Sequence, residues 1–420
     1  MFDKTKRSSK SDNFVKMLHR REMGSITNTV FQNSNSHMKF RNFQFKAALE
    51  ICNCHRSMIV QIVYARRIIF ALTSCGTCAA FSREANKKLC LLNTTPGQTI
   101  RSIFYNKENN SLITVSLYPF DTSLKCRTTP IEYIKRGQPE AGYPLFQSES
   151  FYWPGYIVFD NFNGRILSFS PQNGIYKVFD LNNYALLFSI TDTNIMDIQI
   201  TKGMILLIFR KSPIEDHLDF RILSMINGNV LKSLRHVLHS QKKLDFIGQF
   251  QEKLFIKQEN NNMQIIDVVD DRLIEVSDTD IMTTSPFIVL NDKQLFLTFH
   301  NRSVNVRNFQ GELVASFDEH LIWQPYSNSS NICVTGDQNY IISFCKVDSS
   351  GVDRGNRSIN ICNVVSGKRF SMISSNDDNA PTIKSSVKEA LENVTRLCYN
   401  EEYNEIYTGN TLGMVHIWSN

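Results

Sequence analysis

The side chains best placed to do chemistry are potential metal ligands near the start of the chain. Cys75 and Cys78 are separated by two residues, a spacing at which two thiolates can bind one tetrahedral zinc ion. The chain has no second pair at this spacing, and the turn at Gly76 and Thr77 should place the two cysteines opposite each other on neighbouring strands. Small apolar thiols are common in buried strands, so we predict that neither a metal nor another cofactor binds. The full set of candidate ligands is Cys52, Cys54, His55, Cys75 and Cys78.

Carboxylates are the second group that could do chemistry. Three acidic clusters, at 215–216, 267–271 and 377–378, contain the paired carboxylates that acid–base catalysis uses. Each cluster lies beside an expected turn, where a solvated loop accounts for the charges. The chain also lacks a Gly-rich phosphate loop ending in Lys-Ser/Thr, a Gly-x-Ser-x-Gly nucleophile elbow and a His-Glu-x-x-His motif. We therefore predict that the protein is not an enzyme, and an enzyme of unusual type remains an alternative.

The composition is that of a chain that folds around a large core. Of the 420 residues, 42% are apolar, including 29 Phe, and 20% are charged, which is too few for a disordered chain. Ten Cys do not make a disulfide scaffold in a chain of this length. The N-terminal segment has no apolar core of the kind a signal peptide needs, and no run approaches the ~20 apolar residues of a spanning helix. We predict an intracellular protein of the nucleus, the cytoplasm or both, with no membrane segment.

The first 39 residues are polar and basic. Their charges follow no periodicity, so we predict a disordered tail that folding does not require. The same charge could act as a nuclear-import signal or contact nucleic acid. Basic pairs elsewhere lack a register of aromatic residues on which bases could stack, so we do not expect nucleic acid as a partner. The basic residues that cluster in the tail are Lys4, Lys6, Arg7, Lys10, Lys16, Arg20 and Arg21.

From about residue 40 the chain alternates between short apolar runs and turn clusters. Val, Ile, Phe and Tyr dominate the runs, which is typical of strands. One pattern is helical instead, at Ser385–Val394, where Val387, Leu391 and Val394 share a face. The first unit shows four consecutive strands joined by turns, which predicts an antiparallel meander. These strands are expected at Met58–Tyr64, Arg67–Thr73, Cys78–Arg83 and Lys88–Leu92.

The meander recurs with a period of about 40 to 45 residues, which indicates a β-propeller. Longer intervals fit loop insertions, at Pro119–Gly142 in the second unit and at 348–357 and 374–386 in the seventh. We predict eight four-stranded blades, and seven blades remain possible. The first strands are expected near Ile59, Arg101, Gly155, Ile195, Leu244, Phe287, Asn331 and Val394.

The two ends of the chain should complete one blade together. The segment from Val394 to the C-terminus contains only three strands, and Phe40–Cys52 contains one. Adding the N-terminal strand as the outer edge of the last blade closes the sheet system and removes a free edge. The expected fold is therefore an all-β, closed propeller with the N-terminal strand closing the C-terminal blade.

The last repeat contains a recognisable motif. Between Tyr407 and Trp418, Thr408 and Trp418 match the Ser/Thr and Trp of the second-to-third strand segment of a WD40 repeat. The turn Asp of that pattern is missing, and its terminal Trp-Asp becomes Trp418-Ser419. Degenerate endings occur at 178–180, where Asp180 takes the place of the Asp, and at 265–268 and 306–309. His320 stands where a repeat opens with Gly-His, with Glu replacing Gly.

The chain thus resembles the divergent WD40 repeat-like, or transducin-like, β-propeller proteins, and is most similar to uncharacterised plant members. The resemblance covers residues 40–420 and implies one domain in which Thr408, Trp418, His320 and Asp180 have structural roles. It implies a non-catalytic scaffold that binds other proteins, as a monomeric propeller within a complex. One alternative is a substrate receptor of a cullin-type ubiquitin ligase, although residues 179–182 lack the Trp and Arg of the Trp-Asp-x-Arg box. The other is an enzyme with a propeller active site.

Overall fold

The structure is a computed structural model in which most of the chain from residue 44 onward is described. Residues 1–43, which include the basic tail, lie outside the described part, so the predicted disorder of the tail and the single domain at 40–420 remain predictions. The described residues are 44–51, 57–118, 120–192, 194–210, 217–239, 242–250, 252–259, 261–276, 288–300, 303–317, 331–346, 357–374, 387 and 389–419.

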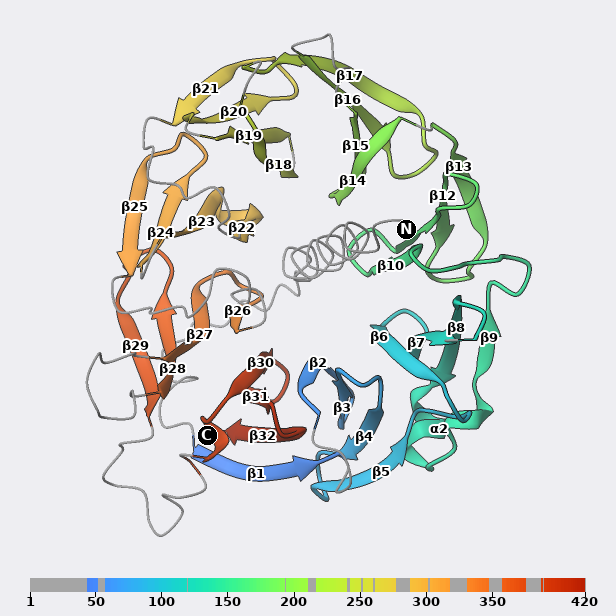
Figure 1. Ribbon diagram of the computed structural model, residues 1–420. Coiled ribbons are helices and arrows are strands. Elements are labelled where there is room, and N and C mark those ends of the chain that lie inside the picture. Colours follow the sequence, from blue (N-terminus) through green and yellow to red (C-terminus); the bar gives the residue numbers. More distant parts are fainter. Residues whose placement is uncertain are drawn as a thin grey trace, which may run out of the picture. The chain divides into compact units, whose positions relative to one another are not determined.

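The described strands form eight antiparallel sheets of four strands each, labelled in Figure 1. This arrangement confirms the predicted all-β propeller with eight blades. Each predicted first strand is present and begins within two residues of its expected start. The chain divides into two compact units, whose described parts lie within 26–157 together with 320–420, and within 158–319.

The first unit holds four blades. Two follow each other near the N-terminus, one precedes the C-terminal blade, and the fourth combines both ends of the chain. Their strands are β2 (Ile59–Ala65), β3 (Ile68–Thr73), β4 (Cys78–Ser82), β5 (Lys87–Leu91); β6 (Thr99–Asn106), β7 (Ser111–Tyr118), β8 (Ser123–Pro130), β9 (Tyr143–Leu145); β26 (Ile332–Val334), β27 (Tyr340–Lys346), β28 (Arg357–Asn363), β29 (Arg369–Ser374); and β1 (Gln44–Glu50), β32 (Met414–Ser419), β31 (Glu405–Asn410), β30 (Val394–Asn400).

The second unit holds the other four blades, and β10 begins two residues before its boundary. Each blade is again a simple meander of consecutive strands. The strands are β10 (Tyr156–Asp160), β11 (Arg165–Ser170), β12 (Ile175–Asp180), β13 (Leu186–Ile190); β14 (Ile195–Thr201), β15 (Met204–Phe209), β16 (His217–Ser224), β17 (Val230–Val237); β18 (Leu244–Phe250), β19 (Lys253–Gln258), β20 (Met263–Asp267), β21 (Leu273–Val276); and β22 (Ile288–Leu290), β23 (Leu295–His300), β24 (Ser303–Asn308), β25 (Leu313–Phe317).

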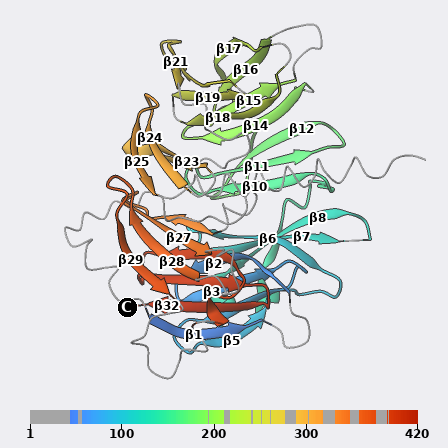
Figure 2. The ribbon, with the colours of Figure 1, turned by 60° about the vertical axis from the view of Figure 1, so that its left-hand side comes forward.

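The N-terminal strand closes the C-terminal blade, as predicted. In both ribbon views β1 lies along β32 (Figures 1 and 2), and the two strands pair antiparallel with Leu49 opposite Val415. Leu49 and Val415 are buried together with Ile417 and with Ile59 of the neighbouring blade. Because β1 pairs with β32, the outer edge of β32 is not exposed to solvent as an unpaired ladder.

The core lies between neighbouring blades, which explains the apolar character of the second strands. All six residues of β3, IIFALT, are buried, because blades pack on both faces of this strand. The outer strand β17 alternates between half-buried and exposed residues along most of its length, because it has a solvated face. Within each unit, buried apolar clusters thus hold neighbouring meanders together.

The structure corrects the predicted insertion at Pro119–Gly142. This segment contains β8, a full strand of its blade, followed by the short helix α2 (Ile131–Lys135) and the 3₁₀ turn η1 (Pro139–Ala141). Helix α2 buries Ile131 and Ile134 against the blade, and Gly137 ends it with a φ of 73°. A further 3₁₀ turn, η2, lies at Asn291–Lys293.

The predicted helix at Ser385–Val394 falls partly outside the described residues. Residues 387, 389 and 390 are helical, but 391–393 form a turn and Val394 opens β30 instead of ending the helix. The predicted apolar face is nevertheless the packed one, because Val387, Leu391 and Val394 join one cluster with Trp418. Within the described residues, no helix is long and apolar enough to cross a membrane.

Candidate functional site

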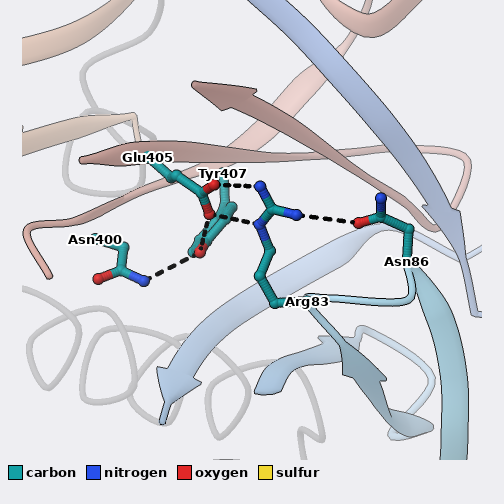
Figure 3. Close-up of polar contacts among 5 residues, drawn as sticks. All are labelled: Arg83, Asn86, Asn400, Glu405 and Tyr407. Carbon is teal, nitrogen blue, oxygen red and sulfur yellow. Dashed lines mark hydrogen bonds and ion pairs between the residues drawn. The ribbon is translucent and has the colours of Figure 1, made fainter. Parts of the chain in front are cut away.

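A charged cluster joins the closing blade to the first blade (Figure 3). Arg83 directly follows β4, and its Nε donates to Glu405 Oε2 at 2.7 Å while its Nη2 contacts Glu405 Oε1. Tyr407 donates its hydroxyl to Glu405 Oε2 at 2.8 Å, and Asn400 Nδ2 donates to the Tyr407 oxygen at 3.0 Å. Glu405 is only 4% exposed. The fork of Arg83 therefore compensates a buried carboxylate across two blades.

This cluster has the properties of a structural clamp. Hydrogen bonding to Glu405 raises the pKa of Arg83 above its ordinary value, so the guanidinium stays charged. Burial raises the pKa of Tyr407, which keeps the phenol protonated and donating. Both oxygens of Glu405 accept hydrogen bonds, so this carboxylate is held by its neighbours and is poorly placed to act as a base.

Trp418 and Thr408 lie in the core of the closing blade. The indole Nε1 donates to Thr408 Oγ1 at 3.0 Å, which joins the two residues that match the WD40 pattern. Trp418 is 0% exposed and its ring lies edge-on to Phe45 of β1 at 5.4 Å between centroids. This side chain therefore ties β1, β31 and β32 together.

Asp180 ends β12, where its carboxylate organises a turn. Oδ1 accepts the backbone N–H groups of Asn182 and Asn183 at 2.8 and 3.2 Å, and Oδ2 accepts from Arg165 Nη1 at 2.9 Å. Leu181, which follows, is 0% exposed. His320 lies outside the described residues.

The cysteine pair does not have the geometry that its spacing suggested. Cys78 lies in β4 opposite Leu72, whereas Cys75 is an exposed turn residue, so the two are not cross-strand neighbours. The prediction was wrong because the connection spans 74–77, and Gly76 takes a φ of 87° within it. A Cβ at Gly76 would lie 2.3 Å from Thr99 Cγ2, so only glycine fits there.

The two thiols also differ in chemistry. Burial raises the pKa of Cys78. Partial burial acts in the same direction on Cys75, but hydrogen bonds with Thr73, Thr77 and Ser57 outweigh it and lower its pKa to about 7. Cys52, Cys54 and His55 lie outside the described residues, and no group of three possible metal ligands occurs within the described part.

A turn at the end of the third strand recurs in five blades. A short polar residue accepts the backbone N–H two positions later, and the intervening apolar residue is buried and donates its own N–H to the residue preceding the second strand. Three of these strand ends are the degenerate WD40 endings found in the sequence, but the shared turn was not predicted. Its pattern is a polar residue followed by a buried apolar residue, with a positive φ three or four positions after the polar residue. The polar residues are Asp180, Ser224, Asp267, Asn308 and Asn363.

A groove of about 570 Å³ lies on the blade β14–β17. Its walls come from β15, β16 and β17 and from the segment before β14. No sequence motif links these elements. The lining residues are Asp192, Asn194, Phe209, Arg210, His217, Asp219, Phe220, Arg221, Ser233, Leu234 and Arg235.

Arginines dominate the chemistry of this groove. The Arg221 guanidinium lies 4.9 Å from the centre of the Phe209 ring and 3.4 Å from Asp192 Oδ2. Arg235 Nε donates to Asp219 Oδ1 at 2.9 Å, and His217 Nε2 is 4.0 Å from the same oxygen. Each carboxylate of the groove thus faces an arginine, an arrangement better suited to recognising charged and aromatic groups than to proton transfer.

Apolar side chains are exposed on the outer strand of the same blade. Val230, Leu231 and Val237 of β17 are 54%, 58% and 74% exposed, and Ile226 in the preceding turn is 73% exposed. Apolar residues of this size gathered beside a polar groove are typical of interaction surfaces.

The solved structures similar to this chain share little sequence identity with it, and one of them is a WD40 β-propeller domain. The computationally designed Ika8 protein covers 89% of this chain and 100% of its own, with 14% identity and a TM-score of 0.52, which shows the fold alone. BamB from Moraxella catarrhalis covers 90% and 98%, with 13% identity and a TM-score of 0.48. The WD40 β-propeller domain of Doa1 covers 91% and 98%, with 15% identity and a TM-score of 0.45.

Comparison with curated proteins gives no match. A family model does match, over residues 24–418, and its description is "Domain of unknown function (DUF7899)". Since this match spans nearly the whole length, the chain belongs to the DUF7899 family.

Proposed function

We propose that this protein is a non-catalytic scaffold that binds other proteins, as a monomeric propeller within an intracellular complex of the nucleus or cytoplasm. The observation that carries the proposal is the arginine-lined groove of the blade β14–β17 beside the exposed apolar residues of β17. Arginine and aromatic residues are enriched where proteins meet, and they dominate binding energy there.

A partner protein can replace the ion pairs within the groove by ion pairs of its own. Arg221 and Asp192 are 39% and 31% exposed, and Arg235 and Asp219 are 65% and 46% exposed. Pairs this exposed contribute little to stability, so a partner's carboxylate can replace Asp192 or Asp219 at modest cost. The apolar residues of β17 would add buried area beside these charged contacts.

The outer strand β17 also offers a backbone edge. It is the last strand of its sheet and spans eight residues, from Val230 to Val237. An extended segment of a partner can add to such an edge through main-chain hydrogen bonds. Groove, apolar residues and edge together favour a polypeptide as the ligand.

The test is affinity purification of the full chain from cells, with co-purifying proteins quantified by mass spectrometry. The groove variant is Arg221→Glu with Arg235→Glu, and the charge-matched control is Lys87→Glu with Lys368→Glu, two exposed sites outside the groove. We expect at least one protein to co-purify stoichiometrically with the wild type and the control, and to fall at least tenfold with the groove variant at unchanged melting temperature. Recovery of a cullin adaptor would assign the scaffold to a ubiquitin ligase. The absence of any stoichiometric protein would overturn the proposal.

A further inference from the structure

We propose that the blade β6–β9 carries a docking surface for an acidic segment of a partner protein, with Phe120 as its apolar anchor. This inference rests on the proposed scaffold function and names a second surface and its ligand. The surface is made of Arg101, Tyr118, Phe120, Lys125 and Trp153, and is called the aromatic–cation patch below.

Phe120 lies at the tip of the hairpin that joins β7 to β8. Its side chain is 99% exposed, the highest value among the exposed large apolar residues of the described chain. Two contacts hold the described residues on either side of Phe120, because Tyr118 pairs with Ser123 and Asp121 Oδ1 accepts the Ser123 N–H at 2.9 Å. A phenyl ring presented to solvent on a fixed hairpin loses little conformational freedom on binding, as an interface anchor requires.

Trp153 lies against the same hairpin from a later loop. Its backbone N–H donates to Thr122 O at 2.8 Å, and Tyr152 forms a bridge to Ser123. The Trp153 side chain is 37% exposed. The loop before β6 adjoins the hairpin as well, since Thr95 Oγ1 lies 3.4 Å from the Tyr118 hydroxyl. These contacts bring the aromatic residues to one end of the blade.

Two cations are held over the rings of the patch. Lys125 Nζ is 4.4 Å from the centre of the Tyr118 ring, and the Arg101 guanidinium is 5.9 Å from the centre of the Trp153 ring. Among the described residues, no ion pair within 4 Å engages either cation. Cation–π contacts fix the positions of the charges while leaving their hydrogen-bond donors exposed.

A carboxylate-bearing polypeptide is the ligand that this arrangement fits. Carboxylates would supply hydrogen-bond acceptors to Arg101 and to Lys125, which among the described residues has only the electrostatic attraction of Asp121, and an apolar pocket between the carboxylates would take Phe120. Single-stranded nucleic acid also uses aromatic residues and cations, but it needs open ring faces for base stacking. Here a cation covers one face of Tyr118 and one face of Trp153, so Phe120 is the one ring of the patch with both faces open, which favours a protein ligand over a run of stacked bases.

The test begins with 12-residue peptides selected by phage display on the immobilised full chain. Affinities of the selected peptides, and of labelled dT20, are then measured by fluorescence anisotropy. The patch variants are Phe120→Ala and Arg101→Glu, with Arg101→Gln as the milder substitution should the charge reversal lower the melting temperature. Matched controls are Leu412→Ala, whose side chain is 42% exposed, and Lys87→Glu.

We expect selected peptides rich in Asp and Glu, whose affinity falls at least tenfold with each patch variant and is unchanged in the controls. Peptides that lose affinity only with the groove variant Arg221→Glu/Arg235→Glu would overturn this inference and leave the scaffold function standing. Binding of dT20 that the patch variants abolish would show the patch to be a nucleic-acid site and would also overturn it. Failure to select any peptide, together with no co-purifying protein, would contradict both proposals.

Discussion

At the residue scale, Trp418 has two stabilising contacts that can be separated by mutation. It buries its whole ring in the cluster that joins two blades and donates its indole N–H to Thr408. Replacing a buried Trp by Ala costs about 3–5 kcal/mol through lost burial and the cavity left behind. We expect Trp418→Ala to lower the urea midpoint strongly. Thr408→Ala should lower the free energy of unfolding by about 1 kcal/mol.

Trp153→Ala is the matched control for Trp418→Ala. Trp153 is 37% exposed, so its removal should cost clearly less stability than the removal of Trp418, which is 0% exposed. Equal urea midpoints for Trp418→Ala and the wild type would show that Trp418 does not anchor the closing blade.

His416 gives the closing blade a dependence on pH. It is 4% exposed and lies between Ala48 of β1 and Thr408 of β31, with the Phe45 ring 5.9 Å away. Burial lowers its pKa to about 4, opposed in part by a backbone hydrogen bond with Thr408. The unfolded chain then binds a proton more readily than the folded one. The neutral form of His416 contributes fully to the free energy of unfolding above pH 6.5, and this contribution is lost as the pH falls toward 4.

We therefore expect about 2 kcal/mol of the stability at pH 7.5 to be lost at pH 5 through His416. Carboxylates also titrate in this range, so the measurement compares the urea unfolding of the wild type with that of His416→Leu at both pH values. The variant should lose about 2 kcal/mol less than the wild type. The same loss in both proteins would exclude His416 as the cause.

At the scale of elements, the clamp between Arg83 and Glu405 should couple the first blade to the closing blade. Their side chains are 21% and 6% exposed, so Arg83→Met leaves a buried carboxylate without its partner. We expect this change to cost about 3 kcal/mol in the free energy of unfolding. The double variant Arg83→Met/Glu405→Gln should cost less than the sum of its parts, as a double-mutant cycle would show. Additive effects would mean that the ion pair does not act across the blades.

The closing strand β1 gives a second prediction at this scale. Deleting residues 1–35 leaves β1 intact, and we expect the melting temperature to change by a few degrees at most. Deleting residues 1–55 removes the partner of β32 and the burial of Leu49, so the melting temperature should fall sharply. Differential scanning fluorimetry of both proteins measures the difference. Equal melting would contradict closure by β1.

Strand positions could be predicted from the sequence where the buried side chains are apolar. Runs such as IIFALT in β3 and MILLIF in β15 have the composition of strands buried on both faces. The strand β8 was missed because its sequence, SLKCRTTP, is polar, and yet Thr128 is 0% exposed. Thr128 donates to Ser111 Oγ at 2.8 Å, and this pairing removes the cost of burying both hydroxyls. The pattern of residues along the sequence does not show that two such hydroxyl groups face each other across neighbouring strands.

The candidate sites were less accessible to sequence reasoning than the fold. Thr408 and Trp418 match the spacing of a WD40 repeat, so the sequence singled out both residues. The groove pairs Asp192 with Arg221, which lie on separate elements and match no motif. The aromatic–cation patch depends on a later loop that places Trp153 beside the β7–β8 hairpin. The spacing of residues along the chain does not predict contacts between separate elements.

At the scale of the whole molecule, the blades provide rigid surfaces and the ligand chemistry lies at their edges and loops. The buried Glu405 and the half-buried Asp180 are occupied by structural contacts. The exposed arginines, aromatic residues and apolar residues are of the types enriched where proteins meet, which supports the proposed scaffold function. We therefore propose that this protein acts by binding another protein through the blade β14–β17.

Hydrogen–deuterium exchange of the full chain, with and without its most abundant co-purifying protein, tests this claim most directly. We predict slower exchange on binding in peptides that cover β15, β16 and β17, from Met204 to Phe209 and from His217 to Val237. Peptides from the buried second strands, such as β3, should exchange slowly in both states. A stable complex in which the exchange of β15–β17 is unchanged would contradict the claim.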